Sequence, residues 1–379
     1  MTTFFILVFL VYSALLLVLT WGWLRLEGKK NLGTSPVKQR LISVIIPFRN
    51  EAACISSMLK NLAAQSYSKE KIEIILVDDH STDVSVSLAM KEALPYLIIL
   101  QLPSGENGKK AALDLGIRQA KGEIIAISDM DCRVPSGWLA KINEGFSSEN
   151  IKMLTGAVRM EQTGSLFSRM QSLEFSSLIG TGGATLGWAQ PTMCNGANLS
   201  FLKSAYEEVR GYEGNATIPS GDDEFLMRKI AARWKDSVQF LHNREAVVST
   251  SAHSSFNEFV HQRLRWGSKW RHNSSFFTKV VALSVIEFHF CFLLFFMAVL
   301  TGKVAWTDAL LLWFIKMVTE ALFLAVVGSF LGLRWSWISF LLLQFTHSFY
   351  VVGIGILSQV KSYNWKGRRW DPVKTAPSH

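Results

Sequence analysis

The chain has 379 residues, of which 49% are hydrophobic and 18% charged, with a formal net charge of +9 and a mean hydropathy of +0.22. It is too apolar for an ordinary soluble enzyme and too charged for a pure membrane bundle, so we expect membrane segments joined to a polar domain. The four cysteines lack C-x-x-C or zinc-ligand spacing, which leaves a disulfide framework and structural zinc without support.

The first element is an uncharged apolar stretch from Phe4 to Leu24, long enough to cross a bilayer at about 20 residues. A secretory signal peptide is the alternative, but such peptides have a basic start and a small-residue cleavage site. Here the basic residues Arg25 and Lys29 follow the stretch, which favours a retained anchor whose carboxyl end is cytoplasmic. We predict a transmembrane anchor over residues 1–24 and a basic juxtamembrane linker over residues 25–40.

Residues 41–275 alternate strand and helix patterns. Apolar, β-branched runs predict strands at 41–48, 72–77, 97–102 and 123–128, and the segments between them predict helices at 51–65, 84–94 and 108–120. This alternation is typical of an α/β domain with a mostly parallel sheet. Such sheets bind ligands in the crevice beyond the carboxyl ends of their strands.

Polar side chains follow three of these strands at the point where each strand ends. They are Asn50 and Glu51, Asp78 and Asp79, and Asp129 and Asp131. Because the carboxyl ends of parallel strands meet at one edge, we expect these groups to line one crevice. Asp129 and Asp131 repel each other, so a divalent cation is the obvious group to stabilise them. For Asp78 and Asp79 the alternative is an Asx turn ahead of Ser81.

The carboxyl third contains three further apolar stretches of near-spanning length, at about 280–300, 309–331 and 335–360. We predict membrane helices over residues 276–362 and a basic tail over residues 363–379. With the amino terminus outside, three full spans would place this tail outside, against the tendency of basic flanks to stay cytoplasmic. One stretch is therefore expected to be re-entrant or interfacial, and Val280 to Leu300, with Glu287 and His289, is the candidate.

Charged residues lie in and beside the predicted spans. Lys316 and Glu320 stand at i and i+4, and a pair that holds the helices together is favoured over a transport role. The basic residues beside the spans favour docking on anionic lipid headgroups over nucleic-acid binding. These are Arg25, Lys29, Lys30, Lys38, Arg40, Arg263, Arg265, Lys269, Arg271 and Lys279.

Six segments occur in a fixed order: VIIPFRNEA, ILVDDHSTD, GKKAALDLGI, SDMD, GDDEFL and QRLRW. Together they resemble the family-2 glycosyltransferases, specifically the membrane-bound inverting branch, over roughly residues 40–270. The resemblance implies a GT-A fold, with a Rossmann-like, mixed but mostly parallel sheet, as a cytoplasmic domain flanked by transmembrane helices. It also implies a nucleotide-sugar donor, usually UDP-linked, and a Mg²⁺ or Mn²⁺ ion held through the second aspartate of the D-x-D, Asp131.

The resemblance also implies roles for single residues. Contacts with the nucleotide-sugar fall on Glu51, Asp78, Asp79, Lys109 and Asp129. Lys110 is an alternative to Lys109, since either cation at a helix start suits a diphosphate.

Asp223 matches the acid that takes a proton from the acceptor hydroxyl. The usual Glu-Asp of the family is Asp-Asp here, so the assignment stays open between Asp222 and Asp223. Capping of the helix that follows is the alternative for both residues.

The segment Q-x-x-R-W is Gln262, Arg265 and Trp266, which share one face of a predicted amphipathic helix near 256–272. The arginine can fork onto pyrophosphate oxygens, and an indole can stack on an acceptor sugar or lipid head. A helix that only lies on the membrane surface is the alternative. Residues 193–201 also resemble the acceptor-side loop of the family.

The expected function is inverting transfer of a sugar from a nucleotide-sugar, which we expect to be UDP-linked, to a membrane lipid or lipid-linked acceptor. The expected place of the reaction is the cytoplasmic face of the inner membrane. Its partners are the donor, the acceptor and the bilayer, with no nucleic acid. The alternative is a processive polysaccharide synthase of the hyaluronan, cellulose or poly-N-acetylglucosamine type. The short set of apolar segments and the tail NWKGRRW favour the lipid acceptor. A silent membrane scaffold or transporter is a third hypothesis, against which the intact acids argue.

Overall fold

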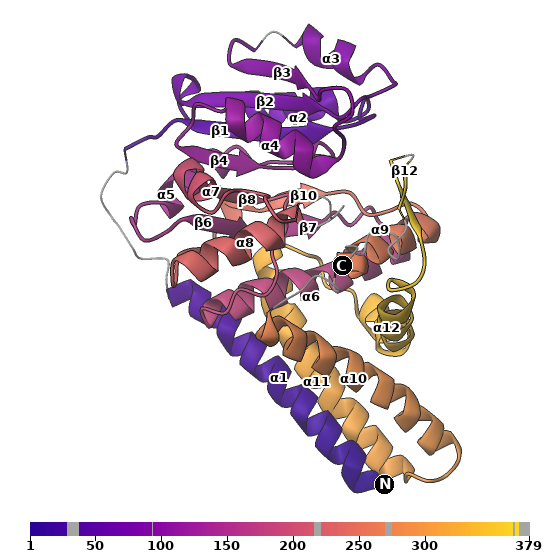
Figure 1. Ribbon diagram of the computed structural model, residues 1–379. Helices are drawn as coiled ribbons and strands as arrows, with labels where there is room; N and C mark the ends of the chain where they lie inside the picture. Colours follow the sequence, from indigo (N-terminus) through magenta and orange to yellow (C-terminus); the bar gives the residue numbers. More distant parts are fainter. Residues whose placement is uncertain (29–37, 93, 216–220, 270–274, 367, 371–379) are drawn as a thin grey trace. The chain divides into compact units, whose positions relative to one another are not determined.

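The structure is a computed structural model that describes residues 1–28, 38–92, 94–215, 221–269, 275–366 and 368–370 (Figure 1). The chain forms two compact units. The sheet unit comprises residues 26–161 and 193–251, and the helical unit comprises residues 1–25, 162–192 and 252–379. Residues 162–192 and 252–275, which fall inside the domain expected over 41–275, thus group with the long apolar helices. Most of the predicted linker and tail lies outside the described residues.

The sheet unit is built on a seven-stranded sheet with the order β3-β2-β1-β4-β8-β6-β9. The strands are β1 (Ile42–Phe48), β2 (Ile72–Asp78), β3 (Leu97–Gln101), β4 (Ile124–Ile127), β6 (Met153–Gly156), β8 (Leu199–Leu202) and β9 (Val238–Leu241). β1 pairs in parallel with β2 and β4, β2 does so with β3, and β6 with β9. Only β8 runs antiparallel to its neighbours in this sheet. The predicted fold class and all four predicted strands are confirmed.

Helices of the sheet unit follow the strands as the alternation predicts. They are α2 (Ile55–Ala63), α3 (Ser85–Lys91), α4 (Lys109–Gln119), α5 (Trp138–Gly145), α7 (Lys203–Glu208) and α8 (Asp222–Arg233). All seven residues of β2 are buried, because β-branched and apolar side chains cover both faces of this strand. Gly116 brings α4 close to the sheet, since a Cβ there would meet Ile45 at 2.6 Å.

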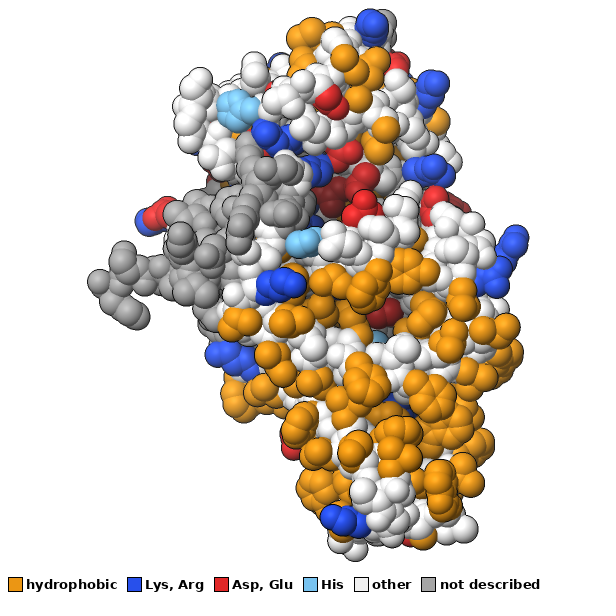
Figure 2. Space-filling model, turned by 90° about the vertical axis from the view of Figure 1, so that its right-hand side faces the viewer, with side chains coloured by type: hydrophobic (Ala, Val, Ile, Leu, Met, Phe, Trp, Pro, Cys, Tyr) orange, Lys and Arg blue, Asp and Glu red, His pale blue; other side chains and the backbone are white. Residues whose placement is uncertain are grey.

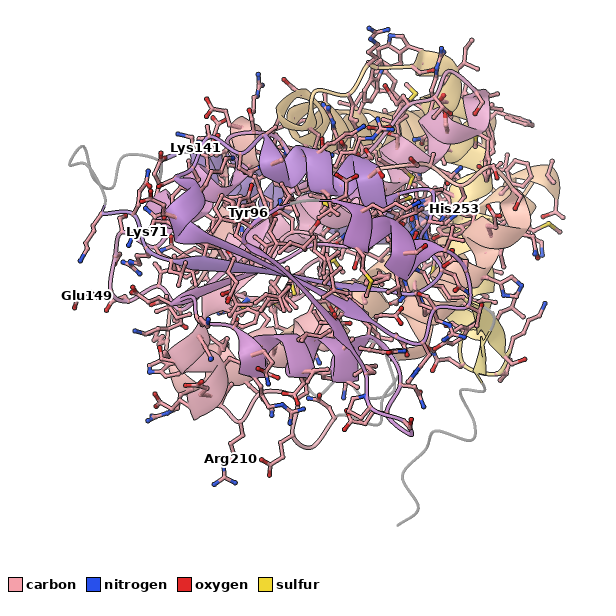
Figure 3. All side chains as sticks on the ribbon, turned by 90° about the horizontal axis from the view of Figure 1, so that it is seen from above. Lys71, Tyr96, Lys141, Glu149, Arg210 and His253 are labelled. Atoms are coloured by element: carbon pink, nitrogen blue, oxygen red, sulfur yellow. The ribbon has the colours of Figure 1, made fainter. Side chains whose placement is uncertain are left out.

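A second, three-stranded sheet holds the chain just after the D-x-D segment. It has the order β5-β10-β7, with β5 (Cys132–Arg133), β7 (Val158–Met160) and β10 (Val248–Thr250). β5 pairs antiparallel with β10 directly after Asp131, which fixes the backbone there. Figure 3 shows Lys71, which directly precedes β2, and Glu149 on one side of the sheet unit. The carboxyl ends of the parallel strands lie at the opposite side.

The helical unit contains the long apolar helices. Its elements are α1 (Thr2–Gly28), α6 (Leu166–Gly187), α9 (Phe256–Ser268), α10 (Phe276–Leu300), α11 (Trp306–Leu331), α12 (Trp337–Leu357) and a hairpin of β11 (Tyr363–Trp365) with β12 (Arg368–Trp370). By length and composition α1, α10, α11 and α12 could each cross a membrane. All four carry exposed hydrophobic side chains, and Figure 2 shows such side chains gathered on one face of the helical unit, which suits contact with lipid.

Three of these helices run between the same two ends of the bundle. Phe5 of α1 meets Phe295 of α10 at 5.2 Å between ring centroids, and Tyr12 stacks on Phe288 at 3.6 Å. The carboxyl end of α1 meets that of α11, where Trp23 contacts Phe330 at 5.5 Å. α1 is therefore antiparallel to α10 and parallel to α11, and Figure 1 shows the three side by side.

α12 follows a different course. Figure 1 shows it nearly end-on beside the other three helices. Just before α12, the backbone of Arg334 forms two bonds of 3.0 Å with the side chain of Gln162, ahead of α6. Just after it, Gln359 Nε2 donates to the carbonyl of Gly267 in α9 at 3.2 Å. α12 thus begins beside α6 and ends beside α9, whereas α10, for which we expected an exceptional course, is one unbroken helix alongside α1.

The predicted pairing of Lys316 with Glu320 is confirmed, with 2.8 Å between Nζ and Oε2. Lys316 Nζ also donates to Gln344 of α12 at 2.8 Å, and the Tyr12 hydroxyl of α1 donates to Glu320 at 2.9 Å. The polar groups satisfy one another inside the bundle, as buried charges must. The pair therefore ties α1, α11 and α12 together.

Candidate active site

The loops after β1 and β2 are fastened to each other at the carboxyl edge of the sheet. Arg49 Nη1 donates to the carbonyl oxygens of Asp79 at 2.6 Å and His80 at 2.7 Å. Asn50, whose φ of 52° lies in the left-handed region, accepts from the amide of Thr82 at 2.8 Å. The amide of Glu51 donates to Ser85 Oγ at 2.8 Å. Glu51 is thus held at this edge, where the sequence places it.

Asp78 is the last residue of β2, Asp79 directly follows it, and both are buried. The Asp78 carboxylate accepts from the amide of Ser81 at 3.0 Å, which is the Asx-turn arrangement that the sequence offers as an alternative. Asp79 Oδ2 accepts from the amide of Gly108 at 3.1 Å and so ties β2 to the start of α4. Of the two, Asp79 reaches toward the element that carries Lys109.

Lys109, the first residue of α4, joins segments that are far apart in the sequence. Its Nζ lies 2.6 Å from Asp129 at the end of β4 and 3.6 Å from Asp222 at the start of α8. Burial lowers the pKa of the Lys109 ammonium, but the charges of Asp129, Asp222 and Asp223 outweigh this effect and raise it above its ordinary value. Lys109, rather than Lys110, is therefore the cation of this acidic edge.

Lys110 points elsewhere. Its Nζ donates to the carbonyl of Asn215 at 2.8 Å and lies 4.9 Å from the ring centroid of Phe225. The sequence leaves Lys109 and Lys110 as alternative contacts for a diphosphate. Their different partners favour Lys109, which lies among the acidic residues.

Asp223 connects α8 with the loop at 193–201. Its Oδ2 accepts from the amide of Gly196 at 3.0 Å, and its Oδ1 accepts from the amide of Glu224 at 2.8 Å. A Cβ on Gly196 would lie 3.3 Å from both Asp222 Oδ2 and Lys109 Nζ, tighter than most Cβ contacts. Because it has no side chain, Gly196 lets this loop approach the charged cluster. In the sequence, only the resemblance of residues 193–201 to the acceptor-side loop of the family pointed to this contact.

Asp131 is exposed, and its Oδ1 accepts from Cys132 Sγ at 3.8 Å. Among the described residues, no group of three His, Cys, Asp or Glu side chains could hold a metal ion. Mg²⁺ and Mn²⁺ sites that bind nucleotides commonly use one or two carboxylates, with phosphate oxygens and water completing the shell. The exposed carboxylate of Asp131 and that of Asp129, whose side chain is 37% exposed, fit such a donor set.

In the sheet unit, acidic and basic side chains are gathered on the face that Figure 2 turns to the viewer. The arrangement provides an ammonium, several carboxylates and an exposed acid at the carboxyl edge of a parallel sheet. It can hold a charged, oxygen-rich ligand and accept a proton.

The Q-x-x-R-W residues lie on α9 in the helical unit. Ser255 caps this helix by accepting from the amide of Glu258 at 3.2 Å. Gln262, Arg265 and Trp266 are half-buried, and the Trp266 ring lies 5.9 Å from that of Phe175 in α6. The three residues share a helix as predicted, and their role toward a ligand stays a prediction.

One basic residue differs from expectation. Arg263 is only 3% exposed and forms an ion pair with Glu174 of α6. It cannot dock on lipid headgroups, because its charge faces the protein interior. Lys29, Lys30 and Arg271 lie outside the described residues, whereas Lys279 is exposed.

Comparison with known proteins identifies the family of one domain, which includes most of the sheet unit and α6. Residues 43–210 match the family described as Glycosyl transferase family 2. The chain carries a family 2 glycosyltransferase domain. This match includes β2 and β4, the loops after them that carry Asp79 and Asp129, and the segment that contains Lys109.

Two curated relatives are similar in sequence to this chain. Glycosyltransferase AglE of Haloferax volcanii is 27% identical over 236 residues, which cover 60% of this chain and 71% of AglE. The poly-beta-1,6-N-acetyl-D-glucosamine synthase of Staphylococcus aureus (strain COL) is 30% identical over 197 residues, 51% of this chain and 45% of the synthase. The match thus spans less than half the length of that second relative.

A solved structure supports the fold of the family 2 domain. The mannosyltransferase PcManGT from Pyrobaculum calidifontis, solved in complex with GDP-Man and Mn²⁺, superposes with a TM-score of 0.53 at 15% identity. The similarity covers 93% of this chain and 97% of that one. The predicted GT-A fold is confirmed.

Within the range of the family match, the sequence interpretation missed α6 and its Glu174. The signal was weak, because α6 is rich in glycine and serine and lacks a clear apolar stripe. A Cβ on Gly180 would lie 2.7 Å from Val327 of α11, so these small residues serve close packing. The serine at position 165, which caps α6 by accepting from the amide of Ser168 at 3.0 Å, is the signal that could have found it.

Proposed function

We propose that this protein transfers a sugar from a UDP-linked nucleotide-sugar to a membrane lipid or lipid-linked acceptor, with inversion at the anomeric carbon. The observation that carries the proposal is the position of Lys109 between Asp129 and Asp222, at 2.6 and 3.6 Å. It brings together the D-x-D segment, the helix start that suits a diphosphate and the D-D segment that supplies a base. A family 2 domain with these groups at one sheet edge supports glycosyl transfer.

In the proposed reaction, the acceptor hydroxyl oxygen forms a bond to the anomeric carbon while the bond from that carbon to the diphosphate oxygen breaks. The hydroxyl proton passes to a carboxylate of the D-D pair, which we assign to Asp223, and the nucleoside diphosphate leaves. Asp79, Glu51 and Asp129 hold the nucleoside and sugar of the donor. Asp131 would hold a Mg²⁺ or Mn²⁺ ion, which neutralises charge on the departing diphosphate when bound.

The acceptor class is supported by the helical unit. Four helices are long and apolar enough to cross a membrane, and the hydrophobic surface they expose suits an acceptor that resides in lipid. A processive polysaccharide synthase is the second candidate, because the relative from Staphylococcus aureus is a poly-beta-1,6-N-acetyl-D-glucosamine synthase. A single transfer to a lipid is favoured, since the described residues contain only three such helices after the family 2 domain.

A donor and acceptor panel tests the proposal. Purified protein in detergent should release UDP from one UDP-sugar in the presence of Mn²⁺ and lipid extract, and mass analysis should show one sugar added to a lipid. GDP-sugars belong in the panel, since PcManGT was solved with GDP-Man. A ladder of products would establish the synthase instead. No transfer from any nucleotide-sugar would refute both functions.

We also propose that the sheet unit faces the cytoplasm at the inner membrane and that α12 lies at the membrane surface. α1, α10 and α11 run between both ends of the bundle, whereas α12 begins beside Gln162 and ends beside Gly267. If only the first three helices span, the chain returns to the cytoplasm after α11. The basic tail then stays cytoplasmic, in keeping with the usual distribution of positive charge.

Cysteine labelling tests this topology. In a variant whose four native cysteines are replaced, a Thr375→Cys thiol should react with a membrane-impermeant maleimide only in inside-out vesicles. Thr301→Cys, in the turn between α10 and α11, is the matched control and should react only from outside. Labelling of both thiols from outside would show that α12 spans the membrane.

A further inference from the structure

The buried face of α9 contains a charged group that the proposed reaction does not use. Arg263 is bonded through Nη2 to Glu174 Oε2 of α6, and Glu174 Oε1 accepts from the Tyr350 hydroxyl of α12 at 3.1 Å. Arg263 and Glu174 are only 3% and 6% exposed. One guanidinium thus joins three helices of the helical unit.

The same guanidinium contacts two members of the Q-x-x-R-W segment. Its Nη1 donates to Gln262 Oε1 at 3.0 Å. Its Cζ lies 4.3 Å from the ring centroid of Trp266, within the range of a cation–π contact, and 4.8 Å from that of Phe259. Gln262 and Trp266 are therefore both held from the interior by Arg263.

Stability alone does not account for this arrangement. Apolar side chains of similar volume often replace a buried ion pair without loss of stability. A guanidinium, by contrast, offers several donors in a rigid plane, so it can bond Glu174 and Gln262 while its face lies on Trp266. A lysine at this position could keep the charge but could not contact Glu174, Gln262 and the Trp266 ring at the same time.

We propose that Arg263 is a positioning residue that sets the side chains of Gln262 and Trp266 for the acceptor, with Glu174 and Tyr350 fixing its own orientation. This inference rests on the proposed function of the Q-x-x-R-W segment. It assigns to Arg263 no contact with the substrate.

Kinetic measurements on Arg263→Lys test the proposal, because this variant keeps the ion-pair charge. The acceptor kcat/KM should fall about tenfold or more through misplacement of Trp266, while the donor KM stays unchanged. Arg263→Met should show the same split with a lower melting temperature. Lys316→Met is the matched control, since Lys316 forms another buried ion pair in the same unit, with Glu320 of its own helix.

A loss of acceptor kcat/KM in Lys316→Met equal to that in Arg263→Lys, or a parallel rise in donor KM, would show that Arg263 is merely structural. A second arm does not depend on activity. In protein labelled with 5-fluorotryptophan, the ¹⁹F resonance assigned to Trp266 by its loss in Trp266→Phe should shift in Arg263→Lys and stay in place in Lys316→Met. An unmoved resonance in Arg263→Lys would overturn the inference, even if the parent transfers no sugar and the proposed function itself fails.

Discussion

The Asp223→Asn variant should transfer sugar at least about a hundredfold more slowly than the parent while its donor affinity stays near normal. Asparagine matches aspartate in size but cannot take a proton from the acceptor hydroxyl. Donor binding should survive because the donor is assigned to the strand-end acids and Lys109. Calorimetry with the nucleotide-sugar and turnover at saturating donor measure the two quantities separately.

The structure adds a control to this experiment. Both oxygens of Asp223 accept backbone amide bonds, from Gly196 and Glu224, and asparagine can accept only one of them with its single oxygen. Melting temperatures must therefore show that the variant is folded under assay conditions. If donor binding collapses while turnover at saturating donor is normal, Asp223 binds the donor, and Asp222 becomes the candidate base.

The Asp131→Ala variant should lose Mn²⁺-dependent turnover and keep its fold. Asp131 is exposed, and its proposed partner is an ion brought by the ligand, so truncation leaves no buried charge behind. Glu149→Ala is the matched control, because Glu149 is also exposed and lies on the opposite side of the sheet unit (Figure 3). The control should behave as the parent does.

Metal affinity provides a readout besides activity. Titration of Mn²⁺ in the presence of UDP, followed by electron paramagnetic resonance, should show weaker binding in Asp131→Ala than in Glu149→Ala. Chelator-treated Asp131→Ala that regains parental turnover on addition of Mn²⁺ would remove Asp131 from the metal site.

The parallel half of the sheet was predictable because its strands are marked by composition. The strands β1, β2 and β4 are buried on both faces and therefore read as mostly apolar runs, in which Ser43 and Glu73 are exceptions, and each is followed by a polar loop. The carboxyl-edge rule then places Asp79 and Asp129 on one side without knowledge of any distance. β6, β8 and β9 have four residues each, too few to show a period in the sequence.

Long-range pairing at the site could not be predicted. The sequence suggests a phosphate for Lys109, whereas the structure pairs it with Asp129 and Asp222, residues 20 and 113 positions away. A basic residue next to a predicted span likewise suggests lipid, yet Arg263 turns inward because α6 offers it Glu174. Ion pairs between residues that are far apart in the sequence depend on tertiary packing, which local sequence patterns do not encode.

The ion pairs of Lys109 bear on how the reaction rate depends on pH. Since the pKa of this ammonium is raised in the folded protein, its stabilising contribution is complete below the ordinary lysine value of about 10.4 and is lost only as the pH rises through the higher folded-state value. Between about pH 6 and 9, the side chain of Lys109 therefore keeps a constant positive charge. An ascending or descending limb of the rate profile in that range must therefore come from another group.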